Sequence, residues 1–478
     1  MKSRLFARKS IARIKAEAEA HNLERHLSWP NLLSLGIGAI VGAGIFVFTG
    51  TVSAQYTGPA IVISFIISAL ACALAGLCYA EFASTIPVAG SAYTYAYATL
   101  GELVAWAIGW DLLIEYALGT ASVAVGWSGY MVSFFEHFGV HLPPQLTQCL
   151  GTSIRLADGS TVEGLFNVPA ALIVLLVSGV LLTGAKESVK FNNLIVAIKL
   201  SVLATFILVG LAHLQPANLV PFIPENTGVF GEYGWSGIFR GAGVIFFAFI
   251  GFDCVSTAAQ ETKNPKRDMP IGILGSIVIC TLIFIGVSLA LNGVVSYKQL
   301  NVADPIAVAV DSLNMPWLSL LIKVGAITGL TSVIFVLMFG LSRILFTIAR
   351  DGLLPPLFSR LHPKTRSPHL TILLQGAVIA VFAGLIPIHL LGEMVSIGTL
   401  SAFVIVSVGV LYLHYKEPDR PRAFRVPAMP WIPLASMGAC GYLMAGLPAH
   451  TWERLLVWML IGLGVYFAYG RRNSTLNG

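Results

Sequence analysis

Glycine clusters interrupt two of the long hydrophobic stretches in this chain. Residues 36–46 read GIGAIVGAGIF, and residues 241–253 read GAGVIFFAFIGFD, where glycines flank an aromatic cluster. Glycine is the poorest helix former after proline, at roughly 1 kcal/mol per residue relative to alanine. Hydrocarbon tolerates an opened helix only where its backbone is buried in protein or lines a wet cavity. The exposed N–H and C=O groups can then bind a small polar ligand, an arrangement typical of transporter sites.

A lysine lies inside another apolar stretch. Lys199 stands in NNLIVAIKLSVLATFI, about 10 Å from the edge of the stretch at 1.5 Å per residue. An intramembrane charge is costly and is a functional hypothesis by default. Burial disfavours the ammonium form relative to the amine, so this side chain could carry a proton reversibly. The alternative is a lysine that snorkels to the inner headgroups, which its depth barely permits.

Two acidic residues share a face of a third stretch. Asp111 and Glu115 are four residues apart in the sequence, which places them on the same side of a helix. Glu115 falls near mid-membrane. It could supply a negative charge for the cationic side chain of a ligand, or it could pair with a buried polar group as part of the structure.

Twelve apolar stretches are long enough to position these residues in a bilayer. The chain is 56% hydrophobic and 11% charged, whereas soluble domains carry about 25% charged residues. Each stretch approaches the roughly 20 residues that span a bilayer. We expect spans at 32–54, 60–82, 103–134, 167–184, 192–212, 236–260, 270–292, 316–342, 368–386, 390–413, 431–447 and 453–470. The glycine clusters fall in the first and sixth spans, which begin two halves that cross in opposite directions. That correspondence favours a binding site over close helix packing, the ordinary use of membrane glycines.

Basic residues indicate the orientation of these spans. If the N-terminus is cytoplasmic, 23 of the 29 lysines and arginines lie in cytoplasmic segments and 3 lie in outer loops. This bias predicts that both ends are cytoplasmic. The basic composition then reflects topology and gives no case for nucleic-acid binding. The charged N-terminal segment of about 30 residues disfavours a cleaved signal peptide, and we interpret it as a solvated helix rather than a lipid-binding arm.

The sequence shows no pattern for a cofactor, a metal or an enzyme. Five of the six cysteines fall within spans and Cys149 lies in an outer loop, so we expect no disulfide framework. We find no metal-ligand spacing, no phosphate loop and no Ser/His/Asp arrangement. A channel would show a continuous polar or charged pore lining, which is not found either. These observations favour a carrier over a channel or a membrane enzyme.

Six runs of sequence carry a family resemblance. They are LGIGAIVGAGIF, FFAFIGFDCVSTAAQETKNPKRDMPIGI, PVAGSAYTYAYATLGE, GWDLLIEYAL, ARDGLLPPLFSRLHPKTRSP and FRVPAMPWIP. Over roughly residues 25–470 the chain resembles the amino acid–polyamine–organocation (APC) transporters, most closely the bacterial relatives of the cationic amino-acid transporters. The resemblance implies an all-α membrane protein of 12 helices with a LeuT-type inverted repeat of five plus five helices, in which helices 1 and 6 are broken. The implied units are a cytoplasmic N-terminal segment, two five-helix repeats, helices 11 and 12, and a cytoplasmic tail, at 1–30, 31–214, 215–415, 416–470 and 471–478.

The resemblance also implies how an amino acid is bound. The carboxylate would accept from the backbone N–H groups of Ala43, Gly44 and Ile45. The ammonium would donate to the carbonyls of Ile40, Val41, Phe246, Ala248 and Phe249. Phe247 matches the aromatic gate of the family, with ordinary aromatic packing as the alternative. Glu115 matches a glutamate of the cationic branch, although neutral amino-acid carriers can share it, and Leu330 would narrow the side-chain pocket and favour a small substrate.

Coupling to protons is implied at Lys199. In proton-coupled relatives a lysine at this place occupies the position that sodium takes in sodium-coupled members. Its ammonium would contact the opened part of helix 1 between Gly36 and Ile40, and Thr331 or Ser332 on helix 8.

The sequence therefore predicts a multi-pass protein of the bacterial plasma membrane with cytoplasmic N- and C-termini. We expect it to take up neutral or cationic L-amino acids, or both, with protons by alternating access. The partners are then the substrate, protons and the lipid bilayer. The alternatives are an amino-acid exchanger and a transport subunit that needs a small membrane partner. The second alternative arises because heteromeric relatives carry a linking cysteine in the loop that holds Cys149.

Overall fold

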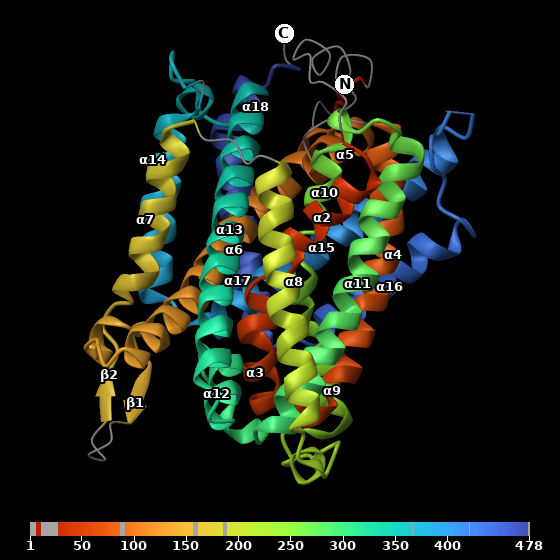
Figure 1. The fold of residues 1–478 in the computed structure, drawn as a ribbon. Coiled ribbons are helices and arrows are strands. Elements are labelled where there is room, and N and C mark those ends of the chain that lie inside the picture. Colours follow the sequence, from red (N-terminus) through yellow and green to blue (C-terminus); the bar gives the residue numbers. More distant parts are fainter. Residues whose placement is uncertain are drawn as a thin grey trace.

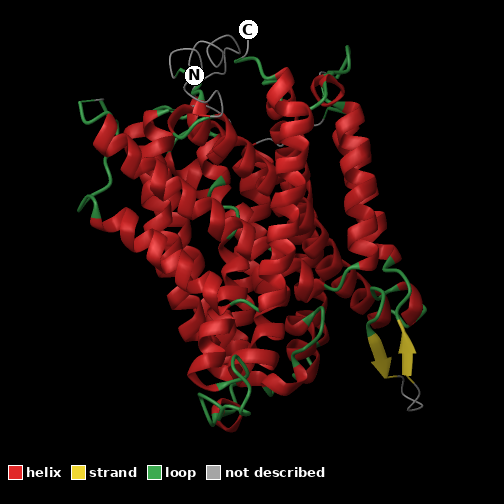
Figure 2. Cartoon of the chain, turned by 180° about the vertical axis from the view of Figure 1, so that it is seen from behind, coloured by secondary structure: helices red, strands yellow, loops and turns green. Residues whose placement is uncertain are grey.

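The chain folds into a bundle of long helices with a short β-hairpin at one edge (Figure 1; Figure 2). The computed structural model describes residues 6–10, 27–86, 91–155, 161–184, 189–365, 367–419 and 421–476. The α-helices are α2 (Trp29–Ile40), α3 (Thr49–Val52), α4 (Ile61–Thr85), α5 (Ser91–Thr99), α6 (Glu102–His137), α7 (Val168–Leu182), α8 (Val189–Ala212), α9 (Gly234–Ile245), α10 (Cys254–Thr257), α11 (Pro265–Val294), α12 (Pro305–Ser312), α13 (Pro316–Arg350), α14 (His369–Leu385), α15 (Ile388–Lys416), α16 (Trp431–Gly446), α17 (Ala449–Val465) and α18 (Arg471–Asn473). The antiparallel hairpin joins β1 (Ser153–Arg155) to β2 (Thr161–Glu163).

Many of these helices have the length and composition of membrane spans. Eight segments of the described chain are long and apolar enough: Gly44–Thr85, Glu102–His137, Asn192–Ala212, Gly234–Ser256, Pro265–Val294, Pro316–Arg350, Ile388–Lys416 and Ala449–Asn473. Three shorter apolar helices are α2, α7 and α14. Large apolar side chains such as Leu208, Leu282 and Leu460 are exposed on the outer faces of the bundle. A lipid-facing surface accounts for them, because lipid tails are as apolar as leucine.

The first glycine cluster separates α2 from the helical turns that follow it. Helix α2 ends at Ile40, and a π-helical turn begins at Gly44 (Gly44–Phe48) and leads into α3. Glycine weakens the continuous helix here, and close neighbours make the small residue necessary. A side chain at Gly44 would overlap the backbone of Ala248. The carbonyl of Phe46 in the second half accepts a hydrogen bond of 2.7 Å from the Tyr130 hydroxyl of α6.

The second glycine cluster separates α9 from α10. After α9 the chain makes a 3₁₀ turn (Phe246–Phe249), and Ile250 then takes an extended conformation. Gly251 has a φ of +114°, a value that residues with a side chain rarely adopt. A Cβ atom added to Gly251 would also lie 3.0 Å from the backbone of Ala39 at the end of α2. Each interruption therefore packs its glycine against the backbone of the other.

A buried polar network ties the two chain ends together at one end of the bundle. Lys9 forms a salt bridge of 2.9 Å with Asp351, which follows α13, and the Tyr93 hydroxyl of α5 donates to the same carboxylate at 2.9 Å. The backbone N–H of Thr475 donates to the Asp351 carbonyl at 3.1 Å. Glu102, the first residue of α6, accepts from Tyr466 and from other hydroxyls around it. Residues near both termini therefore lie on the same side of the molecule.

Candidate functional site

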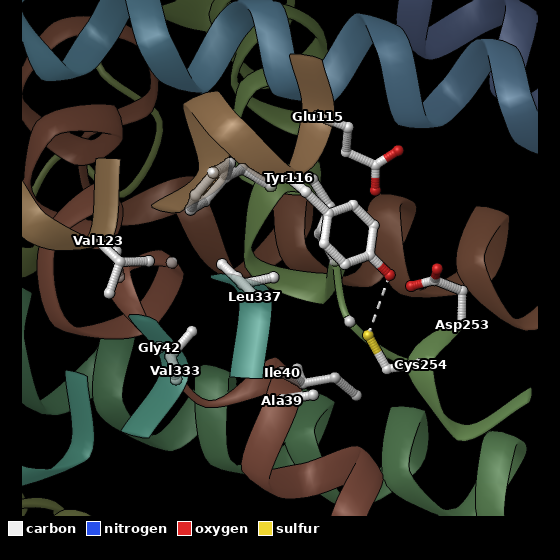
Figure 3. A pocket seen from close by; sticks show the side chains of 16 residues that line it. Ala39, Ile40, Gly42, Glu115, Tyr116, Val123, Asp253, Cys254, Val333 and Leu337 are labelled. Carbon is white, nitrogen blue, oxygen red and sulfur yellow. Dashed lines mark hydrogen bonds between the residues drawn. The ribbon is translucent and has the colours of Figure 1, made fainter. Parts of the chain in front are cut away.

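A small cavity lies where the two interrupted helices meet, between α6 and α13 (Figure 3). Its volume is about 30 Å³, room for about two water molecules. The lining residues come from the two interruptions and from the facing sides of α6 and α13. They are Ala39, Ile40, Gly42, Ala43, Gly44, Glu115, Tyr116, Gly119, Val123, Phe247, Ile250, Gly251, Asp253, Cys254, Val333 and Leu337.

The first interruption offers backbone donors to this cavity. Gly42, Ala43 and Gly44 line it, at the start of the second helical half. The first N–H groups of a helix have no preceding turn to donate to, and the positive end of the helix dipole lies behind them. This is the usual position for binding an anion such as a carboxylate. The N–H of Ile45 is already engaged, since it donates to the Gly42 carbonyl at 3.2 Å.

The structure brings five of the sequence-predicted residues into the cavity wall: Ile40, Ala43, Gly44, Glu115 and Phe247. The other predicted residues lie outside that lining: Val41, Ile45, Phe246, Ala248, Phe249, Leu330, Thr331, Ser332 and Lys199. The Val41 carbonyl, expected to bind an ammonium, accepts from Lys199 at 3.1 Å. The roles assigned to all these residues stay predictions.

Two carboxylates line one side of the cavity. Glu115 on α6 and Asp253 after the second interruption are each 2% exposed. Figure 3 shows both carboxyl groups on the side of the Tyr116 hydroxyl, which shares a hydrogen bond of 3.3 Å with the Cys254 sulfur. The Oε2 atom of Glu115 has no hydrogen-bond partner among the described residues. A buried acceptor without a partner is costly, and a ligand donor that reached this oxygen would remove that cost.

Asp253 was not among the predicted site residues, although the sequence signal was present. An acidic residue two positions after Gly251, in the sixth apolar stretch, is an intramembrane charge of the same kind as Lys199. Tyr116, Gly119 and Val123 were not predicted either. Gly119 and Val123 follow Glu115 at intervals of four on the face of α6 that borders the cavity, and Tyr116 is the immediate neighbour of Glu115.

The opposite side of the cavity is apolar. Val333 and Leu337 of α13 line it, whereas Leu330, expected to narrow the pocket, is fully buried outside the lining. These three residues share a face of α13 at helical spacing, so periodicity from Leu330 would have found the other two. The ring of Phe247 also lines the cavity and lies 4.5 Å from the ring of Phe48, centroid to centroid.

Lys199 binds the end of α2 just outside the cavity. Its side chain is 1% exposed, and its ammonium donates to the carbonyls of Gly38 and Val41, each at 3.1 Å. The last carbonyls of a helix lack intrahelical partners and carry the negative end of the dipole. A cation is therefore stabilised there. The stem of the lysine packs against Gly329 of α13, where an added Cβ atom would lie 3.1 Å from the lysine Cε.

The two hydroxyl residues expected beside Lys199 have partners of their own on α13. Thr331 donates to the Ile327 carbonyl at 2.7 Å and accepts from the Trp127 indole at 2.9 Å. Ser332 donates to the Gly329 carbonyl at 2.8 Å. Both stand within one turn of the glycine that contacts the lysine stem.

Cys149 lies buried beside α14. The residue is 3% exposed, and its thiol donates to the Ala383 carbonyl at 3.6 Å. Burial raises the pKa of this thiol to about 11. Among the described residues there is also no group of three or more His, Cys, Asp or Glu side chains that could hold a metal ion.

Comparison with known proteins identifies relatives over almost the whole chain. A family model described as amino acid permease matches residues 27–465. The methylthioribose transporter of Bacillus subtilis (strain 168) is 43% identical over 475 residues, covering 99% of this chain and 100% of that protein. The branched-chain amino acid permease BcaP of the same organism is 44% identical over 482 residues, covering 100% of both. The vacuolar cationic amino acid transporter 2 of Arabidopsis thaliana is 37% identical over 417 residues, 87% of this chain and 64% of that protein.

Proposed function

Because the chain belongs to the amino acid permease family of the APC superfamily, we propose that it is a secondary active transporter that takes up L-amino acids together with protons. The family is one of membrane transporters rather than enzymes, and the apolar helices make the chain a multi-pass membrane protein. The observation that carries the proposal is the cavity between two interrupted helices, with backbone donors on one side and a carboxylate oxygen without a partner on the other. The carboxylate of an amino acid complements the backbone donors, and a cationic side chain would complement the carboxylate oxygen.

We place the substrate carboxylate at the N–H groups of Ala43 and Gly44, where the helix dipole favours an anion. The ammonium then lies near the carbonyl end of α2 at Ile40 and the carbonyls of the 3₁₀ turn after α9. The backbone groups would recognise the carboxylate and ammonium that all amino acids share. The other residues of the cavity wall would then contact the substrate side chain. Phe247, against Phe48, closes over the bound substrate.

The remaining wall supports a substrate with a neutral or a cationic side chain. Val333 and Leu337 offer an apolar surface, and Glu115 and Asp253 offer negative charge. The relatives differ in the same way, since one is named for branched-chain amino acids and another for cationic amino acids. A third is named for methylthioribose, a sugar whose hydroxyl groups could also donate to Glu115. That compound is therefore the second candidate substrate.

We propose twelve membrane crossings with both termini in the cytoplasm. The apolar helices α2 and α9 each continue past an interruption, and together with α4, α6, α7, α8, α11 and α13 to α17 they would supply the crossings. Residues near the two chain ends meet at Asp351, which supports an even number. The interlocked interruptions of α2 and α9 support an inverted repeat of residues 31–214 and 215–415, followed by two further helices at 416–470.

Proton coupling is proposed at Lys199. In its charged form the lysine donates to two carbonyls at the end of α2 and so holds the first interruption against α8. The neutral amine lacks the charge that strengthens those bonds. Loss of the proton would therefore loosen α2 and allow the cavity to open. An exchanger that does not use protons is the alternative.

A ligand screen followed by reconstituted transport tests the proposal. The purified protein is heated with each of the twenty L-amino acids and with methylthioribose, since a ligand that binds the folded state at 100 times its Kd adds about 2.7 kcal/mol of stability. We expect stabilisation by at least one amino acid, and uptake of the same compound into proteoliposomes when the interior is alkaline. Stabilisation by methylthioribose alone would overturn the substrate class. Uptake that ignores the pH gradient would overturn the coupling, and fluxes above carrier rates would indicate a channel.

A further inference from the structure

A second and much larger cavity opens on the side of the bundle. It has a volume of about 760 Å³ and lies between α14 on one side and α6, α13, α15 and α17 on the other. Figure 1 shows α14 beside α7 at the outer edge of the bundle. The wall is apolar apart from Gln375 and Arg454. Leu374 and Val378 of this wall are 42% and 49% exposed, so the groove is open along α14.

One cationic residue belongs to the lining of this apolar groove. Arg454 of α17 is part of the lining, and its Nη1 atom is buried with no hydrogen-bond partner in the described chain. Among the described residues no carboxylate forms a salt bridge with Arg454, and the carboxylate of Glu393 accepts from Thr451 at 2.8 Å and from His450 at 3.2 Å. The other polar residue of the lining, Gln375, donates to the Met338 carbonyl at 2.9 Å and so ties α14 to α13.

The apolar wall and the arginine together indicate which kind of molecule would fill the groove. A buried guanidinium nitrogen without a hydrogen-bond partner is costly, and an anion that reaches it removes that cost. An apolar groove open to the bilayer is filled by hydrocarbon. The lining of α14 runs from Leu374 to Ile386, which is about 18 Å at 1.5 Å per residue. That length suits an extended acyl chain rather than a compact solute.

We propose that this groove binds an anionic membrane phospholipid, with one acyl chain along α14 and the negatively charged headgroup on Arg454. The site is separate from the cavity between α2 and α9, since the two share no lining residue. The bound chain would fill the space between α14 and the faces of α6 and α13. It would thereby support the helices that flank the substrate cavity. The inference does not depend on which substrate is carried.

Native mass spectrometry with defined lipids tests the site. The protein is exchanged into micelles that hold either phosphatidylglycerol or phosphatidylcholine with the same acyl chains, and the lipid retained on the protein is counted. We expect wild type to retain phosphatidylglycerol about fivefold better, from the attraction of one arginine. Arg454→Gln should reduce that preference to none. The matched control is Lys298→Gln, which removes one positive charge from an exposed loop outside the groove.

A second pair of variants separates the groove from its charge. Val378→Trp should fill the groove and reduce retention of both lipids, whereas Val381→Trp, equally exposed on α14 but outside the lining, should not. The proposal is overturned if Arg454→Gln keeps the anionic preference, or if Val378→Trp retains as much lipid as Val381→Trp. It is also overturned if inorganic phosphate stabilises the delipidated protein as much as phosphatidylglycerol does, since Arg454 would then bind a free anion.

Discussion

Replacing Lys199 with methionine would remove the proposed coupling group and keep most of its apolar length. The ammonium donates to two buried carbonyls at 3.1 Å, and a hydrogen bond from a charged group contributes about 1.5–3 kcal/mol. The two bonds together thus contribute about 3–6 kcal/mol to holding α2 against α8. Without them, the position of α2 no longer depends on a proton.

The size of the expected transport defect follows from the gradient. One pH unit supplies about 1.36 kcal/mol per proton, which is a tenfold concentration ratio for a carrier that moves one proton with each substrate. Wild type should therefore approach about tenfold accumulation at a gradient of one unit with alkaline interior. Lys199→Met should show no accumulation above equilibration, while it still binds substrate in detergent.

The assay follows labelled amino acid in proteoliposomes whose membrane voltage is held at zero. Lys323→Met is the matched control, because Lys323 is also a buried lysine in an apolar helix but pairs with Asp311 at 3.0 Å. That control should keep accumulation. The coupling proposal fails if Lys199→Met concentrates substrate as well as wild type does. If Lys323→Met loses accumulation as fully as Lys199→Met, the defect is a general effect of losing a buried charge.

Four further changes test other parts of the site. Gly44→Leu should abolish ligand-induced stabilisation while the protein still inserts, because any side chain there meets the backbone of Ala248; a normal thermal shift with ligand would contradict this. Glu115→Gln should weaken arginine or lysine binding about tenfold more than alanine binding, or ~1.4 kcal/mol; equal losses in a competition assay would make Glu115 structural. Gly329→Ala should lower pH-driven accumulation in proteoliposomes yet preserve binding, since its Cβ would crowd the coupling lysine at 3.1 Å; full accumulation would show that the lysine yields freely. Cys149 should resist a maleimide at pH 7, because a pKa of about 11 leaves roughly one thiolate in ten thousand; a prompt mass shift would show an exposed thiol.

Hydropathy predicted where the apolar helices lie but not where they end. The eighth span was expected at 316–342, whereas α13 continues to Arg350. Charged residues end a membrane stretch, yet arginine is a good helix former, so the helix itself runs on. Helix α7 is instead shorter than its predicted span, because it has 15 residues and the span was expected at 167–184. Hydropathy indicates whether a segment prefers lipid or water. The ends of a helix depend instead on its capping residues and on packing.

The backbone part of the site could be predicted because glycine carries a local signal. Gly44 and Gly251 are visible in the sequence, and so is the acidic face of Glu115. The residues that they contact on other helices are not visible in the sequence. Helical spacing from Leu330 would have pointed to Val333 and Leu337, but that Lys199 donates to the Val41 carbonyl depends on how distant helices align, and no spacing within one helix contains that information. Asp253 is different, since its position in an apolar stretch was a signal that had not been used.

The interlocked interruptions also indicate how substrate and proton could act on one element. The cavity has room for about two water molecules, and even alanine has several more heavy atoms than that. Binding therefore requires the cavity to widen, and parting Gly44 from Ala248, or Gly251 from Ala39, would widen it where the interruptions pack against each other. The carbonyls that Lys199 holds belong to the same segment of α2. A substrate that parts the interruptions and a proton that leaves the lysine would bias the same movement. A shared movement of this kind is what coupling requires, because a ligand shifts an equilibrium only through its different affinity for the two states.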